Sequence, residues 1–485
     1  MIRNIPRNIY HYKLDFEVKG IHETAIRILG EIGIYIGSEK CLDLLKSLGC
    51  AIDFKKFNAK IPENLISNSL KKVSSEYNLY NRDGNSHVIY GGNNILLTSG
   101  AAAIRIRESE GKYRSATLED LEKLTRLHDS YEIIDIIHTA VDATDIDQEI
   151  MRVQMAAAVF KNTSKSAWFV ASTPEAVECI YDMALAIRGL KDNLDLKPFF
   201  RIGAASEAVL GFQKDEIELL MRCAELGIPT GCEHYPIMGL TAPLSVSGAL
   251  AITAANYLAA HVVKTAIDPD NQDIFPVMAG SFNMKNGEII TSAPEIWQYY
   301  AAGIKLGQFY GIPTSILASS DSKDVDLQAI YQKAMAYIIS AGAGVNNIFA
   351  ATNDLDSMNL ASYEQVVIDL EIISSIASFL RGMPVLDPDS DFEIIKRSLY
   401  NKMFFLDDPY TLSNFKNFIW DSDIFIRDNF QNWKKGGMKK IIDLANVKVQ
   451  KILSNYEPVK LSNETINEID KILFEYGKTN RQLRI

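Results

Sequence analysis

Two stretches, Phe199-Phe-Arg-Ile-Gly203 and Gly227-Ile-Pro-Thr-Gly-Cys232, show the pattern that decides the fold. Each is a short apolar run bounded by turn residues, which is typical of a buried strand. The chain repeats such runs at intervals of roughly 30 to 45 residues, about the length of a strand followed by its helix. The predicted strands cover seven ranges: Ile133–Val141, Ala167–Ala171, Phe199–Gly203, Gly227–Cys232, Ile274–Ala279, Pro313–Ala318 and Asn347–Ala351.

Strands that alternate with amphipathic helices seven times predict an α/β fold with a parallel sheet. An open, doubly wound sheet would show the same rhythm, but it usually carries a Gly-x-Gly-x-x-Gly turn after its first strand, and this sequence has none. We therefore predict a closed (β/α)8 TIM barrel. Its eighth strand comes from Ile95–Thr98 or from Pro384–Leu386, and the sequence leaves that choice open.

The barrel is predicted to occupy residues 86–387, between two helical extensions. Residues 1–85 show apolar positions at spacings of three and four, which indicates an N-terminal helical segment. The same helical spacing returns in residues 388–485, and no Gly/Ser-rich linker precedes them. We expect this C-terminal extension to pack on the barrel. Short extended runs within His87–Lys112 predict a small antiparallel unit or the entry to a larger sheet.

Composition and charge narrow the function classes. The 485 residues are 47% hydrophobic and 23% charged, which is typical of a globular protein with a large core. The net charge of −11 argues against nonspecific binding to nucleic acid or anionic membranes. The apolar run Ala249–Ala260 is shorter than the roughly 18 residues of a membrane span, and the N-terminus does not resemble a secretory signal. We predict a cytoplasmic protein.

The five cysteines do not suggest a metal centre or a disulfide framework. They are widely spread, and no Cys-x-x-Cys motif is present. Cys223 and Cys232 lie near Glu233 and His234, but catalytic zinc sites usually take their ligands from several strands or from a His-Glu-x-x-His helix. We expect no metal bound by this chain.

Candidate site residues follow the carboxyl ends of the predicted strands, because the loops there converge on one mouth of a parallel barrel. Carboxylates and aromatic rings occur together in this set, and the combination suits a quaternary ammonium ion held by cation–π contact. No lysine stands on a strand at this end, so a Schiff-base mechanism has little support. By this position, the candidates for substrate binding are Trp168, Glu233, His234, Tyr235, Phe282, Asp321, Phe349 and Asn353. Arg201, on the third predicted strand, and Ser357 join these candidates only through a family resemblance.

Structural explanations for the same residues stay open. Each aromatic ring could be a core residue of the barrel, and Arg201 could form an internal salt bridge. Glu233 and His234 could be a hydrogen-bonded polar pair in a loop, and Asp321 could cap the following helix. Position alone therefore predicts a ligand site at the mouth and leaves its chemistry undecided.

Five stretches, taken in order, resemble the trimethylamine methyltransferase family. They span most of the chain, and it is their order rather than any single motif that makes the resemblance specific. The stretches are His22–Gly33, Gly239–Ala251, Ser292-Ala-Pro-Glu295, Ser320–Ala329, and Gly344–Phe349 continued by Leu355–Asp369.

The resemblance implies a TIM barrel and the transfer of a methyl group from a methylated amine to the Co(I) of a corrinoid protein. The corrinoid, a cobalamin, would be carried by this partner, so the chain itself would bind no cofactor. The founding branch of the family uses pyrrolysine at the position of Ser357. A chain that lacks it resembles the branch that acts on glycine betaine and similar quaternary amines. Arg201, ahead of Arg105 and Arg107, is then the candidate partner for a substrate carboxylate.

Two other functions compete with this one. A barrel hydrolase or lyase could use Glu233 and His234 as acid and base, and it would turn over without any corrinoid protein. A noncatalytic barrel could bind a betaine and fail to methylate Co(I). The sequence also leaves open whether the chain forms a homo-oligomer.

Overall fold

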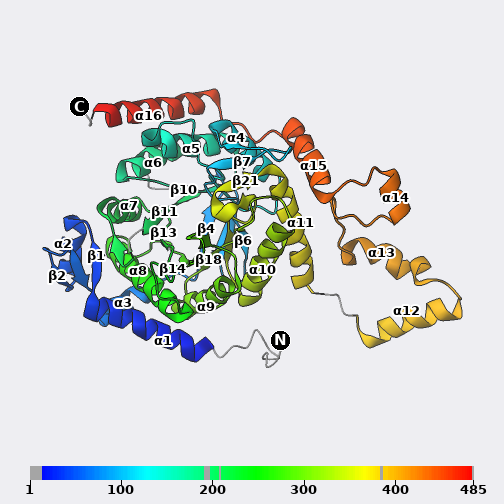
Figure 1. Cartoon of the computed structure of the whole chain (residues 1–485), viewed down its shortest axis with the longest axis horizontal. Coiled ribbons are helices and arrows are strands. Elements are labelled where there is room, and N and C mark those ends of the chain that lie inside the picture. Colours follow the sequence, from blue (N-terminus) through cyan, green and yellow to red (C-terminus); the bar gives the residue numbers. More distant parts are fainter. Residues whose placement is uncertain (1–13, 191–196, 207–208, 383–385, 483–485) are drawn as a thin grey trace.

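The computed structural model describes residues 14–190, 197–206, 209–382 and 386–482. Helices make up about half of the chain and surround a central group of strands, while several helices near the C-terminus stand off to one side (Figure 1). The protein is therefore α/β, as the sequence predicts.

Eight parallel strands lie at the centre of the molecule. They are β6 (Leu96–Leu97), β9 (Ile136–His138), β10 (Ser166–Val170), β11 (Phe200–Ser206), β13 (Thr230–His234), β15 (Phe275–Val277), β18 (Thr314–Leu317) and β19 (Asn347–Phe349). One four-stranded sheet has the order β13-β11-β10-β9 and the other the order β15-β18-β19-β6. All seven predicted strands are present. Ile95–Thr98 supplies the eighth, because β6 pairs in parallel with β19. Residues 383–385, in the other candidate strand, lie outside the described residues.

The two sheets are joined differently at their two seams. At the first seam, a parallel bridge between Thr98 and Ile136 connects the end of β6 to β9. At the second, between β13 and β15, no backbone ladder joins the described strands. Lys264 spans this gap, since its ammonium group donates to the Thr230 carbonyl and lies 2.7 Å from the Asp273 carboxylate. The closed, continuously hydrogen-bonded barrel is therefore not confirmed.

Helices alternate with these strands along the chain. They are α4 (Leu118–Asp129), α5 (Gln148–Asn162), α6 (Pro174–Arg188), α7 (Lys214–Glu225), α8 (Val246–Ile267), α9 (Pro294–Tyr310), α10 (Leu327–Ala343) and α11 (Tyr363–Leu380). Local sequence sets their ends. Thr117 and Asp120 form a capping box at the start of α4, and Pro174 occupies the first turn of α6 after the N-cap Thr173.

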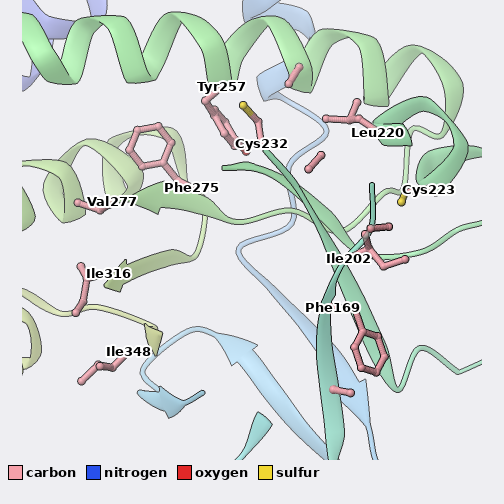
Figure 2. Packing of buried hydrophobic residues seen from close by; sticks show 14 of the residues in the cluster. Phe169, Ile202, Leu220, Cys223, Cys232, Tyr257, Phe275, Val277, Ile316 and Ile348 are labelled. Carbon is pink, nitrogen blue, oxygen red and sulfur yellow. The ribbon is translucent and has the colours of Figure 1, made fainter. Parts of the chain in front are cut away.

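The strands divide their side chains between two faces. Phe169, Ile202 and Cys232 belong to the large core that packs against the surrounding helices (Figure 2). Successive side chains of a strand point to opposite faces, so the adjacent residues Trp168, Arg201 and Glu233 point the other way, into the space enclosed by the strands. That enclosed space holds a second apolar cluster.

Short strands lie at both ends of the parallel strands. At the amino end, β4 (Glu76–Tyr80) and β5 (His87–Gly91) form an antiparallel hairpin, and its stacked rings Tyr77 and Tyr90 belong to the enclosed cluster. The Tyr80 amide donates to the Pro198 carbonyl, just before β11, so the hairpin covers this end. The other short elements are β7 (Arg105–Arg107), β8 (Tyr113–Ser115), β14 (Ile237–Met238), β16 (Gly280–Phe282), β17 (Ile289–Ile290), β20 (Asp354–Leu355), β21 (Leu360–Ser362) and the 3-10 turn η3 (Asp356–Met358).

The N-terminal segment is mixed rather than purely helical. Its helices are α1 (Leu14–Arg27), the π-helical turn η2 (Ile28–Ile32), α2 (Glu39–Ser47) and α3 (Glu63–Leu70). Between them, β1 (Ile34–Ile36), β3 (Asn58–Lys60) and β2 (Ala51–Asp53) form a small sheet that β12 (Gly211–Phe212) extends. Strands of three residues are too short to show the alternation by which a strand is recognised, so the helical spacing dominated the prediction.

The C-terminal extension has a packed part and a projecting part. The helix α15 (Ile441–Asn455) packs on α11, and α16 (Asn463–Gln482) packs on α5 and α6. In contrast, α12 (Pro388–Tyr400), η4 (Phe405–Asp407), α13 (Pro409–Phe418) and α14 (Phe430–Lys435) contribute no buried apolar side chain among the described residues. Within the described part of the chain, no apolar side chain of these four elements joins a core cluster.

One described helix, α8, is long and apolar enough to cross a membrane when judged by length and composition alone. It has 22 residues, and 78% of its most apolar window is buried inside the molecule, where the helix packs on α1 and α7. Burial of this kind is what a core helix shows.

Candidate functional site

Three predicted site residues meet in the space enclosed by the strands. Arg201 on β11 lies in register with Trp168 on β10, and its guanidinium carbon is 3.8 Å from the centre of the Trp168 ring. The same guanidinium lies 3.7 Å from a Glu233 carboxylate oxygen on β13. Two glycines make room for them: a Cβ at Gly203 would lie 2.3 Å from Glu233 Oε1, and one at Gly231 would lie 3.0 Å from Arg201 Nη2.

The charges in this group lack hydrogen bonds. Arg201 is fully buried, yet none of its three side-chain nitrogens has a hydrogen-bond partner among the described protein atoms, and neither does Glu233 Oε1. Buried polar groups are normally hydrogen-bonded, so such atoms mark a place where a ligand would complete the bonding. Burial raises the pKa of Glu233 to about 7, although the Arg201 charge opposes this shift. Near neutral pH the Glu233 carboxyl therefore changes between its two charge states.

Aromatic rings line the same space. The ring centres of Trp168 and Phe349 are 4.6 Å apart, and His138 on β9 contacts both rings edge-on. Burial lowers the pKa of His138 to about 3, so its imidazole is neutral, and its Nε2 has no hydrogen-bond partner among the described atoms. His138 is not among the site residues predicted from the sequence. The one sequence feature that distinguishes it is that a titratable side chain lies inside the predicted strand Ile133–Val141.

Asp321 and Ser357 form a second part of the candidate site. The Asp321 carboxylate accepts hydrogen bonds from the Thr291 amide at 2.8 Å and hydroxyl at 2.7 Å, and from the Ser357 hydroxyl at 2.9 Å. Gln332 on α10 contributes as well, since its Oε1 accepts from the Asp321 amide. Asp326, and not Asp321, caps α10. Asp321 is thus an acceptor held in place from several elements.

The segment that contains Ser357 has a strained backbone. Five of its non-glycine residues have positive φ: Ala350 (53°), Asn353 (64°), Asp356 (50°), Ser357 (54°) and Met358 (73°). Each such residue costs on the order of 1–3 kcal/mol, and strain of this kind persists only where the surrounding structure imposes it, most often at functional sites. Asn353 is also fully buried with no hydrogen-bond partner for its side-chain amide among the described atoms.

A buried ion pair holds this strained segment. Lys333 on α10 and Asp369 on α11 are both fully buried and lie 3.1 Å apart. Lys333 also donates to the Ala350 carbonyl at 3.3 Å, and Asp369 accepts from the Asn353 amide at 3.0 Å. Tyr337 adds a hydrogen bond to the Ala351 carbonyl. The sequence analysis selected neither charge, although Asp369 ends one of the stretches that it quotes.

His234 lies apart from Glu233. It faces α8, where its Nδ1 is 3.1 Å from the Thr253 hydroxyl, because neighbouring residues of a strand point to opposite faces. Burial lowers the pKa of His234 to about 4. The two residues therefore do not form an acid–base pair on one ligand.

The remaining candidates lie at the edges of the site. Tyr235 packs against the enclosed cluster and is near Gly280, where a Cβ would lie 3.2 Å from the Tyr235 hydroxyl. Phe282 is half-buried at the end of β16. Arg105 and Arg107 already have carboxylate partners, namely Asp356 and Asp324. Arg201 is therefore the candidate arginine whose nitrogens lack hydrogen bonds.

The cysteines near this site are core residues. Burial raises the pKa of the Cys223 thiol to about 12 and that of Cys232 well above its usual value, and both side chains pack in the apolar core (Figure 2). The described part of the chain contains no group of three or more His, Cys, Asp or Glu side chains that could hold a metal ion.

Fold and site together define an α/β protein with a charge pair between its central strands and a strained loop that follows the carboxyl end of β19. The family model for trimethylamine methyltransferase (MTTB) matches residues 2–476. The chain belongs to this family.

Curated relatives match over almost the whole chain. Glycine betaine methyltransferase of Desulfitobacterium hafniense (strain Y51) is 26% identical over 471 residues, which cover 97% of this chain and 98% of the relative. Trimethylamine methyltransferase MttB of Methanosarcina barkeri (strain Fusaro) is also 26% identical, with coverage of 96% and 95%. The crystal structure of M. barkeri monomethylamine methyltransferase (MtmB) has a similar fold, with a TM-score of 0.50, 11% identity and coverage of 97% and 94%.

Proposed function

We propose that this protein transfers a methyl group from a betaine-type quaternary amine to the Co(I) of a corrinoid protein. The corrinoid protein acts as co-substrate. Co(I) supplies the electron pair for the new Co–C bond, the N–CH3 bond breaks, and its electron pair stays on nitrogen, so a neutral tertiary amine leaves. The family membership and the glycine betaine relative support this reaction class.

The observation that carries the proposal is the Arg201–Glu233 pair, in which the fully buried guanidinium has no hydrogen-bond partner among the described protein atoms. A betaine has a carboxylate, which an arginine can bind with two parallel hydrogen bonds, and a quaternary ammonium group, which can donate none. Glu233 would attract that cation through its charge, and the rings beside it would contact the methyl groups. One zwitterion would thus compensate both charges of the pair.

Ser357 favours a quaternary substrate. Its hydroxyl is hydrogen-bonded to Asp321, and a serine cannot supply pyrrolysine chemistry at this position. A quaternary amine needs no such activation, because loss of its methyl group leaves a neutral tertiary amine. We place the substrate between Arg201, Glu233 and the rings of Trp168 and Phe349. Tyr235, Phe282, Asp321, Asn353 and Ser357 complete the proposed site near the mouth.

The protein's own contribution is to orient the substrate and to exclude water. Enclosure within the strands keeps the methyl carbon away from competing nucleophiles. We further propose that the two sheets form one (β/α)8 barrel, with Lys264 joining the β13 and β15 edges, and that the protein is cytoplasmic. The hydrolase or lyase alternative loses its acid–base pair, because His234 faces α8.

A spectroscopic assay tests the function. Purified protein is incubated with free Co(I) cobalamin and either glycine betaine or tetramethylammonium, and the visible spectrum is followed for methyl-Co(III). We expect methylation with glycine betaine. Binding without methylation would instead support a noncatalytic barrel, and turnover without a corrinoid would support a hydrolase or lyase.

Arg201→Met tests the carboxylate contact. This change removes the guanidinium but keeps apolar length, so the affinity for glycine betaine should fall by about ten- to one hundred-fold, as the loss of a charged hydrogen bond implies. Affinity for tetramethylammonium, which has no carboxylate, should change by much less. Calorimetry with both ligands gives the comparison. Equal losses for the two ligands would show that Arg201 does not recognise the carboxylate.

A further inference from the structure

Residues 387–440 form a C-terminal arm that projects from the molecule (Figure 1). The arm contains α12, η4, α13 and α14, and it exposes many large apolar side chains. Phe404 is 81% exposed and Tyr400 is 80% exposed. Others with more than half of their surface exposed are Phe392, Leu399, Leu406, Leu412, Ile419, Phe430 and Met438.

The arm exposes a large apolar area. At roughly 150–250 Å² per ring, the exposed fractions of the five phenylalanines Phe392, Phe404, Phe405, Phe415 and Phe430 amount to about 450–750 Å². The largest apolar patch of a typical monomer is about 300–600 Å² in total, and a stable interface buries about 800 Å² per partner. When the exposed aliphatic side chains of the arm are added to these rings, the exposed apolar area reaches the size that each partner buries in a stable interface.

The apolar faces of the arm need a permanent binding partner. Helices of 13, 10 and 6 residues are marginal in water unless an apolar face is packed. A corrinoid protein that must bind and leave in each catalytic cycle would expose these faces repeatedly. Permanent interfaces between copies of one chain are larger and more apolar than transient ones, so the arm fits a second copy better.

The charges of the arm are self-complementary. Although the whole chain has a net charge of −11, residues 387–440 contain nine acidic and nine basic residues. The acidic end, at α12, carries Asp387, Asp389, Asp391 and Glu393, and the basic end, at α14, carries Lys434, Lys435, Lys439 and Lys440. Figure 1 shows α12 and α14 at opposite ends of the arm. Two arms that run in opposite directions across a two-fold axis would pair each acidic end with a basic end.

An apolar hollow at the root of the arm provides a receiving surface. It has a volume of about 500 Å³, and Ile376, Ala377 and Leu380 in the last turns of α11 line it together with Ile95 and Ile133. Ile95 and Ile133 precede β6 and β9, so the hollow lies at the amino ends of the strands. The Asp321–Ser357 part of the candidate site lies at the opposite, carboxyl ends. A contact here would leave the mouth free for a corrinoid protein.

We propose that the C-terminal arm is the interface between two copies of this chain, related by a two-fold axis with the arms antiparallel. Apolar side chains of each arm pack on the arm and the root hollow of the other copy. The acidic end of one arm meets the basic end of the other.

Mass measurement of the full-length protein tests the proposal. At about 10 µM, sedimentation should give an even multiple of the 54.2 kDa chain mass. Phe404→Ser with Leu406→Ser should halve this mass, because both side chains are exposed in the single chain and their loss removes interface contacts only. Met284→Ser is the matched control, since Met284 is 88% exposed outside the arm, and it should leave the mass unchanged. A monomeric parent, or an arm variant that keeps the parental mass, would overturn the proposal.

A charge exchange tests the antiparallel arrangement. Asp389→Lys with Asp391→Lys should raise the dissociation constant of the assembly by about ten-fold or more, because like charges then face each other. Adding Lys434→Glu with Lys435→Glu to the same chain should restore the parental dissociation constant. Failure of this second pair to restore assembly would overturn the arrangement proposed here.

Discussion

Glu233 is the residue whose charge state the enclosed site controls most directly. Burial raises its pKa to about 7, so the fraction of charged carboxylate rises from about one tenth at pH 6 to about nine tenths at pH 8. A quaternary ammonium ion keeps its charge throughout this range. If binding requires the charged carboxylate, affinity for glycine betaine should increase about ten-fold from pH 6 to pH 8. Calorimetry across this range measures the change.

Glu233→Gln provides the control for this pH dependence. The variant should bind more weakly at pH 8 and show a flat profile between pH 6 and pH 8. A parental profile that is flat, or a slope that persists in the variant, would assign the titration to another group. His138 and His234 are poor alternatives, because burial lowers their pKa values to about 3 and about 4.

Strand position indicates part of the candidate site at the residue level. Trp168 and Glu233 are candidates because they lie on predicted strands or at their ends, and the structure brings them together with Arg201. Alternation separates the side chain of His234 from that of Glu233, since adjacent strand residues face opposite ways. Lys333 and Asp369 could not be paired from sequence, because only the packing of α10 against α11 brings them into contact.

The element that depends most on its surroundings is the strained segment 350–358. Lys333→Met would leave Asp369 charged and buried without a cation, and removing one partner of a buried pair typically destabilises a protein by about 3–5 kcal/mol. We expect a loss of that size in the free energy of unfolding, measured by urea titration. Lys323→Met is the matched control: Lys323 is 69% exposed and pairs with Asp356 at 3.0 Å, so its loss should cost less than about 1 kcal/mol. Equal losses would show that the buried pair does not stabilise this segment.

At the scale of the whole molecule, the rhythm of strands and helices was sufficient to predict seven of the eight parallel strands and two candidates for the eighth, but not how the strands meet. The seam between β13 and β15 depends on contacts among Lys264, Thr230 and Asp273, which no local pattern reveals. The arm shows the same limit. Helical spacing predicted helices in residues 388–440, but only the folded chain shows that Phe404 and Tyr400 have no partner within it. Local patterns predict elements, whereas long-range contacts decide their assembly.

Lys264 should therefore control the stability of the assembled strands. It is 1% exposed and 2.7 Å from Oδ2 of Asp273, which is 4% exposed, and the same oxygen lies 3.0 Å from His261 Nδ1. Lys264→Met should lower the free energy of unfolding by about 3–5 kcal/mol, because it leaves the buried Asp273 carboxylate without its lysine partner and removes the bridge to the Thr230 carbonyl. Adding Asp273→Asn removes this charge, so the double variant should be more stable than Lys264→Met alone. Urea titration of the three proteins measures this coupling. If Asp273→Asn instead lowers the free energy of unfolding further, the charge pair does not stabilise the seam. Packing of α8 alone would then hold the two sheets together.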